Sequence, residues 1–218
     1  HSEGTFNDML NNNFDMKIDV VGYGDKWKGF MHKIQTLYEY LENIKDDIII
    51  VIIDGFDTEI NGFIESLYEK FLKFNTKILL STAEESKISK RVYGTCINNI
   101  TVNGGLYMGY NKNIKELYKL MIDNAESNDD QLELNKSCKF LKDKIKIDTS
   151  NEIFLNIRLD SRLFKEQYTN AIFIGRPGQL TFNRLKRVPS EFFHMFKTEI
   201  TVLFTILSII LFYKIKNS

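Results

Sequence analysis

Residues 48–57 read Ile-Ile-Ile-Val-Ile-Ile-Asp-Gly-Phe-Asp, and this stretch decides the fold. A continuous run of six β-branched residues is typical of a strand that is buried on both faces, as in the parallel sheet of an α/β domain. Asp54 and Asp57 follow directly, so the strand carries two carboxylates at its C-terminal end. Open α/β sheets bind ligands at that edge. The stretch therefore predicts an α/β fold with a ligand site where a central strand ends.

The two carboxylates also suggest which ligand the site would take. Hard divalent cations prefer oxygen ligands, so Asp54 and Asp57 could hold such a cation beside a diphosphate. This indicates a nucleotide-sugar site of the Asp-x-Asp type found in glycosyltransferases. Short acidic motifs are also frequent by chance, and the alternative is that Asp57 starts a turn that Asp54 caps. Both interpretations stay open at this point.

Patterns on either side of this strand alternate between strand and helix, which is typical of a layered α/β fold. Apolar residues at helical spacing predict helices over 33–45, 62–74 and 114–122, and short apolar runs predict strands over 17–22, 77–81, 106–110, 153–157 and 171–174. The polar residues 124–131 form a loop or the start of a helix. A chain of 218 residues is long enough for one such domain with a sizeable core.

Composition limits the partners of this chain. Its 29 basic and 29 acidic residues balance, whereas nucleic-acid binding normally needs a clustered basic surface, so we expect no nucleic-acid partner. There are two cysteines, Cys96 and Cys138, which do not make a disulfide framework. They could pair in an oxidising compartment, but we expect two free, partly buried thiols.

The C-terminal segment differs from the rest because residues 200–213 carry no charge. As a helix this segment spans about 21 Å, short of the roughly 30 Å hydrocarbon core of a bilayer. Extended from Lys197 to Lys214, with the lysines snorkelling, it could cross a thin membrane. We expect a membrane helix over 198–213, with a buried core helix as the alternative. Positive charge after it, at Lys214 and Lys216, places the preceding domain in the lumen.

Several separated motifs follow one another between residues 1 and 189. They are 22–29 (Gly-Tyr-Gly-Asp-Lys-Trp-Lys-Gly), 49–57, 80–84 (Leu-Ser-Thr-Ala-Glu), 103–110 (Asn-Gly-Gly-Leu-Tyr-Met-Gly-Tyr), 129–132 (Asp-Asp-Gln-Leu) and 177–183 (Pro-Gly-Gln-Leu-Thr-Phe-Asn). In order and rough spacing they resemble the glycosyltransferase domain of the procollagen lysine hydroxylase/glycosyltransferase family.

The resemblance implies a GT-A fold with a mixed sheet flanked by helices, spanning residues 1–190. It also implies a UDP-sugar donor, usually Mn²⁺, and transfer to a glycan or hydroxylysine-linked acceptor on a collagen-like protein. The family's first strand would precede His1, so the first strand and part of the uridine pocket are expected to be missing. Together with the C-terminal helix, the resemblance implies a membrane protein of the endoplasmic reticulum or Golgi with a luminal domain.

Four residues matching the family's motifs are candidates for sugar binding and catalysis. Gly104 and Gly105 would let the backbone approach a sugar or phosphate closely, or they form an ordinary turn before a strand. Asp129 and Asp130 would bond sugar hydroxyls or hold the acceptor, or they cap a helix. The motif at 54–57 assigns the metal to Asp54 and Asp57.

Three further residues are candidates for nucleotide binding. Trp27 would wall the pocket or pack a loop, and Lys33 would meet a phosphate or be solvated. The family's metal-binding His is absent before the turn at 175–177, where Arg176 could supply some of the lost positive charge to a phosphate. The alternative for Arg176 is a surface position after a strand. A domain that has lost catalysis and acts as a binding module is the alternative function.

Overall fold

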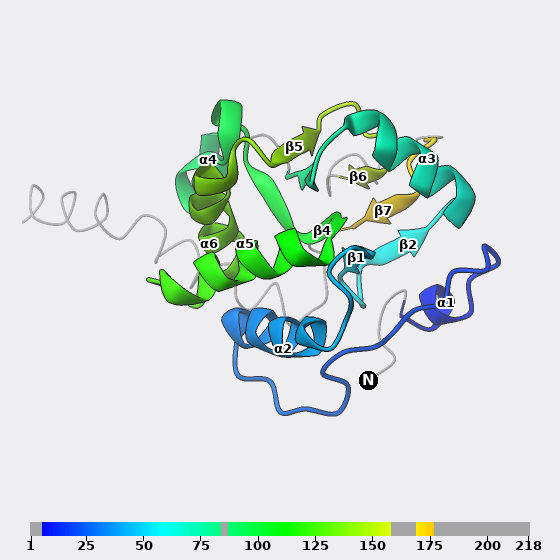
Figure 1. Cartoon of the computed structure of the whole chain (residues 1–218), viewed down its shortest axis with the longest axis horizontal. Coiled ribbons are helices and arrows are strands. Elements are labelled where there is room, and N and C mark those ends of the chain that lie inside the picture. The colour runs from blue at the N-terminus through cyan, green and yellow to red at the C-terminus, as the bar shows by residue number, and fades with distance from the viewer. Residues whose placement is uncertain (1–5, 84–86, 158–168, 177–218) are drawn as a thin grey trace, which may run out of the picture. The chain divides into compact units, whose positions relative to one another are not determined.

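Two β-sheets and the helices packed on them make up the described part of the chain, residues 6–83, 87–157 and 169–176 of this computed structural model (Figure 1). The larger sheet has the order β1-β4-β3-β5 and contains β1 (Ile49–Ile53), β3 (Ile78–Thr82), β4 (Val102–Tyr110) and β5 (Ile145–Asp148). The smaller sheet has the order β2-β7-β6 and contains β2 (Thr58–Ile60), β6 (Phe154–Asn156) and β7 (Phe173–Gly175). The helices are α1 (Phe6–Leu10), α2 (Phe30–Glu42), α3 (Ile64–Phe74), α4 (Lys87–Tyr93), α5 (Asn111–Asp123) and α6 (Asp130–Ser137), with 3-10 turns η1 (Ile97–Asn99) and η2 (Cys138–Leu141).

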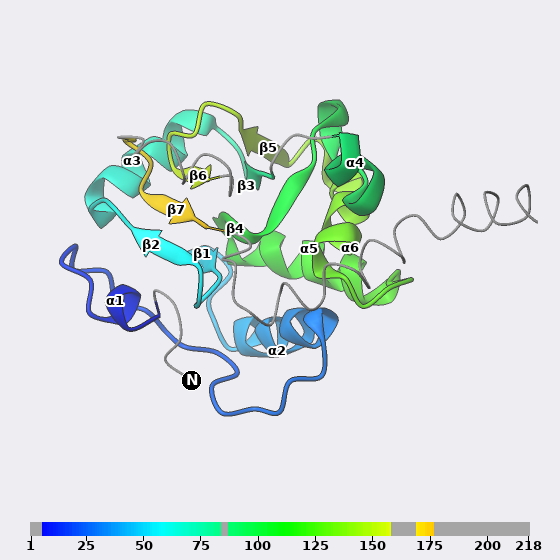
Figure 2. The ribbon, with the colours of Figure 1, turned by 180° about the vertical axis from the view of Figure 1, so that it is seen from behind.

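Two hydrophobic clusters hold these elements together. One joins α2, α5 and α6 to the larger sheet, and the other joins α1 and α3 to the smaller sheet and to the opposite face of β4. In Figures 1 and 2, α2 and α5 lie side by side while α3 lies on the other side of the sheets. Strand β4 runs between the clusters, with Tyr107 in the first and Leu106 and Met108 in the second. The predicted α/β class, a mixed sheet flanked by helices, is confirmed.

The apolar run at 48–53 forms β1, but its surroundings differ from the prediction. It pairs antiparallel with β4, which is its one strand partner among the described residues. The prediction of a central strand in a parallel sheet is therefore wrong. Within β1, Ile50 and Ile52 pack against the first cluster, whereas Ile49, Val51 and Ile53 pack against the second, so both faces of the strand need apolar residues. The pattern of apolar residues along a strand indicates which faces of the strand are covered. It does not indicate whether the neighbouring strand runs parallel or antiparallel.

The three predicted helices are present as α2, α3 and α5, and four of the predicted strands are present as β3, β4, β6 and β7. The predicted strand over 17–22 is wrong, because this segment is irregular. It is held by side chains instead of strand pairing: Ile18 packs against the second cluster, and the Tyr40 hydroxyl donates to Asp19 at 2.7 Å. Gly22 ends it with a φ of 74°, a left-handed backbone that interrupts an extended chain.

Cys96 and Cys138 form a disulfide, so the expectation of free thiols is wrong. Both residues are buried, with 4% and 0% of their surfaces exposed. Cys96 directly precedes η1, and Cys138 begins η2 at the end of α6. The bond therefore ties the loop after α4 to the C-terminal end of α6.

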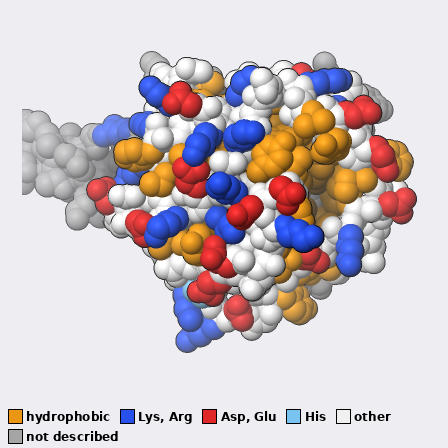
Figure 3. All heavy atoms as spheres, in the orientation of Figure 1, with side chains coloured by type: hydrophobic (Ala, Val, Ile, Leu, Met, Phe, Trp, Pro, Cys, Tyr) orange, Lys and Arg blue, Asp and Glu red, His pale blue; other side chains and the backbone are white. Residues whose placement is uncertain are grey.

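The predicted membrane helix over 198–213 and the predicted domain end at residue 190 lie outside the described residues. Within residues 6–83, 87–157 and 169–176, no helix combines the length and the apolar character that a membrane crossing requires. On the face drawn in Figure 3, side chains of both charges are interspersed. The same face has hydrophobic side chains near α3, where Ile64, Tyr68 and Leu72 are exposed at successive turns.

Candidate active site

Five of the predicted site residues lie together where β1 ends. They are Lys33 of α2, Asp54 after β1, Gly104 and Gly105 of β4, and Asp130 of α6, named here the Lys33 cluster. The ammonium group of Lys33 lies 3.1 Å from Oδ1 of Asp54 and 2.5 Å from Oδ2 of Asp130, and it donates to the carbonyl oxygen of Gly104 at 3.5 Å. Four segments that are far apart in sequence thus supply one charged group of side chains.

The start of α2 is fixed to the loop that precedes α6. The backbone N–H of Met31 donates to the side-chain oxygen of Asn128 at 3.2 Å. Gly29, which caps α2, has a φ of 115°, and a Cβ there would overlap the side chain of Asn128. Lys33 in the first turns of α2 therefore faces Asp130 in the first turn of α6. The role of Asn128 was missed, although it directly precedes the acidic pair singled out in the sequence.

The glycine pair lies within β4, so the interpretation as an ordinary turn before a strand does not hold. The backbone N–H of Asp54 donates to the Gly105 carbonyl at 2.9 Å, and the N–H of Gly105 donates to the side chain of Asn103 at 2.7 Å. A Cβ on Gly105 would overlap the carboxylate of Asp54. The absence of a side chain is what lets Asp54 lie flat against β4. The sequence analysis also predicted no role for Asn103, although this residue directly precedes the two glycines.

Charge and burial differ among the three ionised residues. The Asp130 side chain is 9% exposed, that of Lys33 is 22% exposed and that of Asp54 is 41% exposed. Burial raises the pKa of Asp130, although Lys33 beside it acts in the opposite direction. Burial also works against the charge of Lys33, but Asp54 and Asp130 outweigh it and raise the pKa of Lys33 above its ordinary value. Lys33 is therefore a fixed cation between a buried carboxylate and an accessible one.

Two buried tyrosines belong to the same region of the first hydrophobic cluster. The hydroxyl groups of Tyr107 and Tyr118 lie 2.5 Å apart, and both side chains are fully buried. Burial raises the pKa of both, and the negative charge of Asp130 adds to this effect. The pair is neutral at physiological pH and positions β4 against α5, a role that their sequence spacing did not indicate.

The metal prediction rests on Asp54 and Asp57. Both residues follow β1, but Oδ1 of Asp54 is already in the ion pair with Lys33. No group of three His, Cys, Asp or Glu side chains suited to a metal ion occurs within the described ranges. The Lys33 contacts leave Oδ2 of Asp54 as the carboxylate oxygen that could meet a cation together with Asp57 and ligand oxygens.

The remaining predicted residues make other contacts. The guanidinium of Arg176 pairs with Glu59 on β2 at 2.7 and 3.3 Å, and its backbone N–H donates to the carbonyl of Asp57. The carboxylate of Asp129 accepts a hydrogen bond from the N–H of Leu132 at 2.8 Å, which is the helix-cap arrangement. Trp27 is 61% exposed and packs edge-on against Phe30, as a loop residue does.

Known proteins are similar to this chain over the region that contains the Lys33 cluster. The family described as PLOD GT domain matches residues 5–171. The multifunctional procollagen lysine hydroxylase and glycosyltransferase of Caenorhabditis elegans is 27% identical over 166 residues, which cover 66% of this chain and 22% of that protein. An uncharacterized protein of Acanthamoeba polyphaga mimivirus is 31% identical over 177 residues, 74% of this chain and 38% of that one. The chain thus spans well under half the length of these relatives.

Among solved structures, the galactosyltransferase LgtC, crystallised with donor and acceptor sugar analogues, matches with a TM-score of 0.44 and 15% sequence identity. The matched region covers 66% of this chain and 58% of that one.

Proposed function

This chain belongs to the PLOD GT domain family, and from this we propose that it is a glycosyltransferase that moves a sugar from a UDP-sugar to a glycan or hydroxylysine-linked acceptor on a collagen-like protein. The proposal includes a GT-A arrangement of the sheets. The observation that carries it is the Lys33 cluster, in which residues from four segments meet at the end of β1. Ligands bind at this edge in open α/β sheets.

In this proposal Lys33 binds the donor, and the glycine pair shapes the site around Lys33. Sugar transfer leaves negative charge on the departing diphosphate, which a fixed nearby cation stabilises. Lys33 holds that charge, because the two carboxylates keep it protonated. The carboxylate of Asp54 occupies the space over Gly105, and Asp130 lies beside Gly104, so the glycine pair lets both carboxylates approach the backbone of β4 next to Lys33.

Asp130 is the proposed contact for a sugar or acceptor hydroxyl. Its carboxylate is nearly buried and is held in place by Lys33, so little motion is needed for it to accept a hydrogen bond. Its raised pKa makes it a better proton acceptor than an ordinary aspartate. Asp129 holds the first turn of α6, and so the position of Asp130, through its cap.

Mn²⁺ is also part of the proposal, with Asp54 and Asp57 as the protein ligands and the diphosphate as the other. The partly exposed Asp54 with one oxygen not engaged by Lys33 supports this assignment. Bound there, the cation would act as a Lewis acid that neutralises the leaving diphosphate. Because Lys33 already holds Asp54, we expect Mn²⁺ to bind weakly until a diphosphate is present.

The disulfide supports a proposal about the compartment. Disulfides persist in oxidising environments and are rare in the cytosol. We therefore propose that the domain works in the lumen of the endoplasmic reticulum or Golgi, with the buried Cys96–Cys138 bond as support.

A transfer assay tests the proposed function. The full chain is incubated with a panel of UDP-hexoses, Mn²⁺ and a collagen-like peptide that contains hydroxylysine, and the glycosylated peptide is detected by mass spectrometry. We expect transfer that falls at least about tenfold in Asp130→Asn, because a hydrogen bond to a charged group contributes about 1.5–3 kcal/mol. Asp123→Asn, an exposed change on α5, is the matched control. UDP binding without transfer from any donor would identify a binding module instead of an enzyme.

A further inference from the structure

A groove lies at the other edge of the larger sheet, away from the Lys33 cluster. It has a volume of about 780 Å³ and lies beside β5, whereas Asp54 follows β1 at the opposite edge. Its walls are η1 and η2, and it is named here the η1–η2 groove. None of the Lys33 cluster residues lines it.

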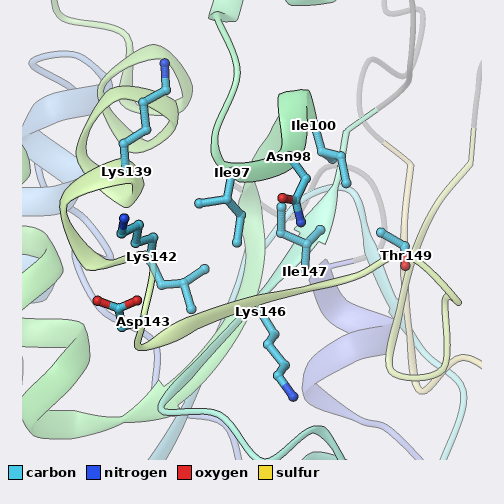
Figure 4. Close-up of a pocket in the computed structure, with 10 residues that line it drawn as sticks. Ile97, Asn98, Ile100, Lys139, Lys142, Asp143, Lys146, Ile147 and Thr149 are labelled. Atoms are coloured by element: carbon cyan, nitrogen blue, oxygen red, sulfur yellow. The ribbon is translucent and has the colours of Figure 1, made fainter.

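The Cys96–Cys138 disulfide joins the two walls of this groove. Cys96 is the residue before η1, and Cys138 is the first residue of η2. Figure 4 shows Ile97 of η1, Ile100 directly after η1 and Ile147 of β5 gathered in the middle of the groove. The groove therefore has an aliphatic floor and walls whose separation is fixed by a covalent bond.

Unpaired positive charge surrounds this floor. Lys139, Lys142 and Lys146 line the groove, and Asp143 is the acidic residue among the lining side chains. All three lysines are exposed, and none has an ion pair or hydrogen bond within the part of the chain that the structure describes. Figure 4 shows Lys139 and Lys146 at opposite margins of the groove, with their side chains extending away from the isoleucines. The whole chain is electrically neutral, so this local excess is not a consequence of a basic composition.

We propose that the η1–η2 groove binds an acidic, extended peptide segment of a partner protein. Apolar side chains of the peptide would enter between the isoleucines, and its carboxylates would pair with the three lysines. Strand β5 pairs with β3 on one side only among the described strands, which leaves an edge beside the groove that an extended peptide can follow. The aliphatic floor and this strand edge favour a peptide over an acidic glycan.

Fluorescence anisotropy of the full chain with a short labelled peptide of alternating Glu and Val residues tests the proposal. We expect saturable binding that weakens as salt is added, because exposed ion pairs are screened. The peptide in which Gln replaces Glu should bind at least about tenfold more weakly. The triple variant Lys139→Glu, Lys142→Glu, Lys146→Glu should lose binding to a similar extent, with its fold checked by circular dichroism.

The matched control reverses three other exposed lysines, with the changes Lys45→Glu, Lys73→Glu and Lys112→Glu, none of which lines the groove. Equal weakening in this control would show diffuse attraction by the surface and would overturn the proposal. Equal binding of the Gln peptide would overturn it as well. So would a sulfated oligosaccharide that binds at the groove when the Glu peptide does not. These outcomes are independent of sugar transfer, so they leave the proposed function untouched.

Discussion

At the scale of single residues, Lys33 holds the site together. It neutralises Asp130, whose side chain is only 9% exposed, and it reaches Asp54 as well. Removing the ammonium group of Lys33 leaves the Asp130 carboxylate with little contact with solvent and without its positively charged partner. Lys33 is thus needed for the structure of the cluster as well as for the proposed binding of the donor.

Lys33→Met should lower the free energy of unfolding by about 1–3 kcal/mol at neutral pH. Without Lys33 the pKa of Asp130 should rise further, because burial already raises it and the opposing charge is gone. A carboxyl group with a raised folded-state pKa favours folding below its unfolded pKa, and that contribution is lost as pH rises through the folded value. The difference in free energy of unfolding between wild type and Lys33→Met should therefore become smaller as the pH is lowered toward 4, measured by urea unfolding. A difference that stays constant from neutral to acidic pH would argue against this pairing.

Gly105→Ala should disturb the site more than Gly104→Ala. A Cβ at residue 105 would overlap the carboxylate of Asp54, whereas one at residue 104 would have its nearest neighbour, the Gln131 backbone, at 3.3 Å. Forcing an extra carbon into a packed site costs about 1–3 kcal/mol. Thermal unfolding of the two variants measures the difference. Equal and small effects would mean that Asp54 does not lie against β4 as described.

Arg176→Ala should have little effect on either stability or UDP affinity. The Arg176 and Glu59 side chains are 30% and 44% exposed, and exposed ion pairs contribute about 0–1 kcal/mol. Calorimetry with UDP checks this result against wild type. A marked loss of UDP affinity would restore the phosphate role that the sequence suggested for Arg176.

At the scale of elements, the disulfide connects η1 to η2 across 42 residues of chain. Closing a loop of this length is expected to stabilise the fold by about 2–4 kcal/mol. The double variant Cys96→Ser, Cys138→Ser should therefore unfold at lower urea concentration than wild type. Wild type under reducing conditions is the control and should match the variant. No difference between oxidised and reduced wild type would contradict a contribution of the disulfide to stability.

The three longest helices of the described chain were predicted, whereas the shorter α1, α4 and α6 were not. The apolar spacing of α2, α3 and α5 repeats over at least 11 residues each, which is enough to distinguish a helix. The two missed strands, β2 and β5, have three and four residues that include charged side chains, whereas the predicted β6 and β7 have three residues each and carry no charge. The antiparallel pairing of β1 could not be predicted either, since a run of apolar residues does not depend on the direction of the partner strand.

At the scale of the whole molecule, the sequence indicated the members of the site one by one but not how they meet. Lys33 and Asp130 lie 97 positions apart, and no local pattern pairs them. The neighbours of each candidate residue are supplied by the fold and not by its local sequence. Gly105 lies against Asp54, while Asp129 caps α6 and Arg176 pairs with Glu59. The disulfide was likewise hidden, because two cysteines become partners only when η1 and η2 meet.

The Lys33 cluster is the proposed binding site for the diphosphate of a UDP-sugar. Isothermal titration of the full chain with UDP, with and without Mn²⁺, tests this claim most directly, using Lys33→Met and the exposed Lys45→Met as its matched control. We predict that wild type and Lys45→Met bind UDP alike and that folded Lys33→Met binds at least about tenfold more weakly, the loss of a charged hydrogen bond. UDP affinity that is unchanged in folded Lys33→Met, or no UDP binding by wild type in either condition, would contradict the claim.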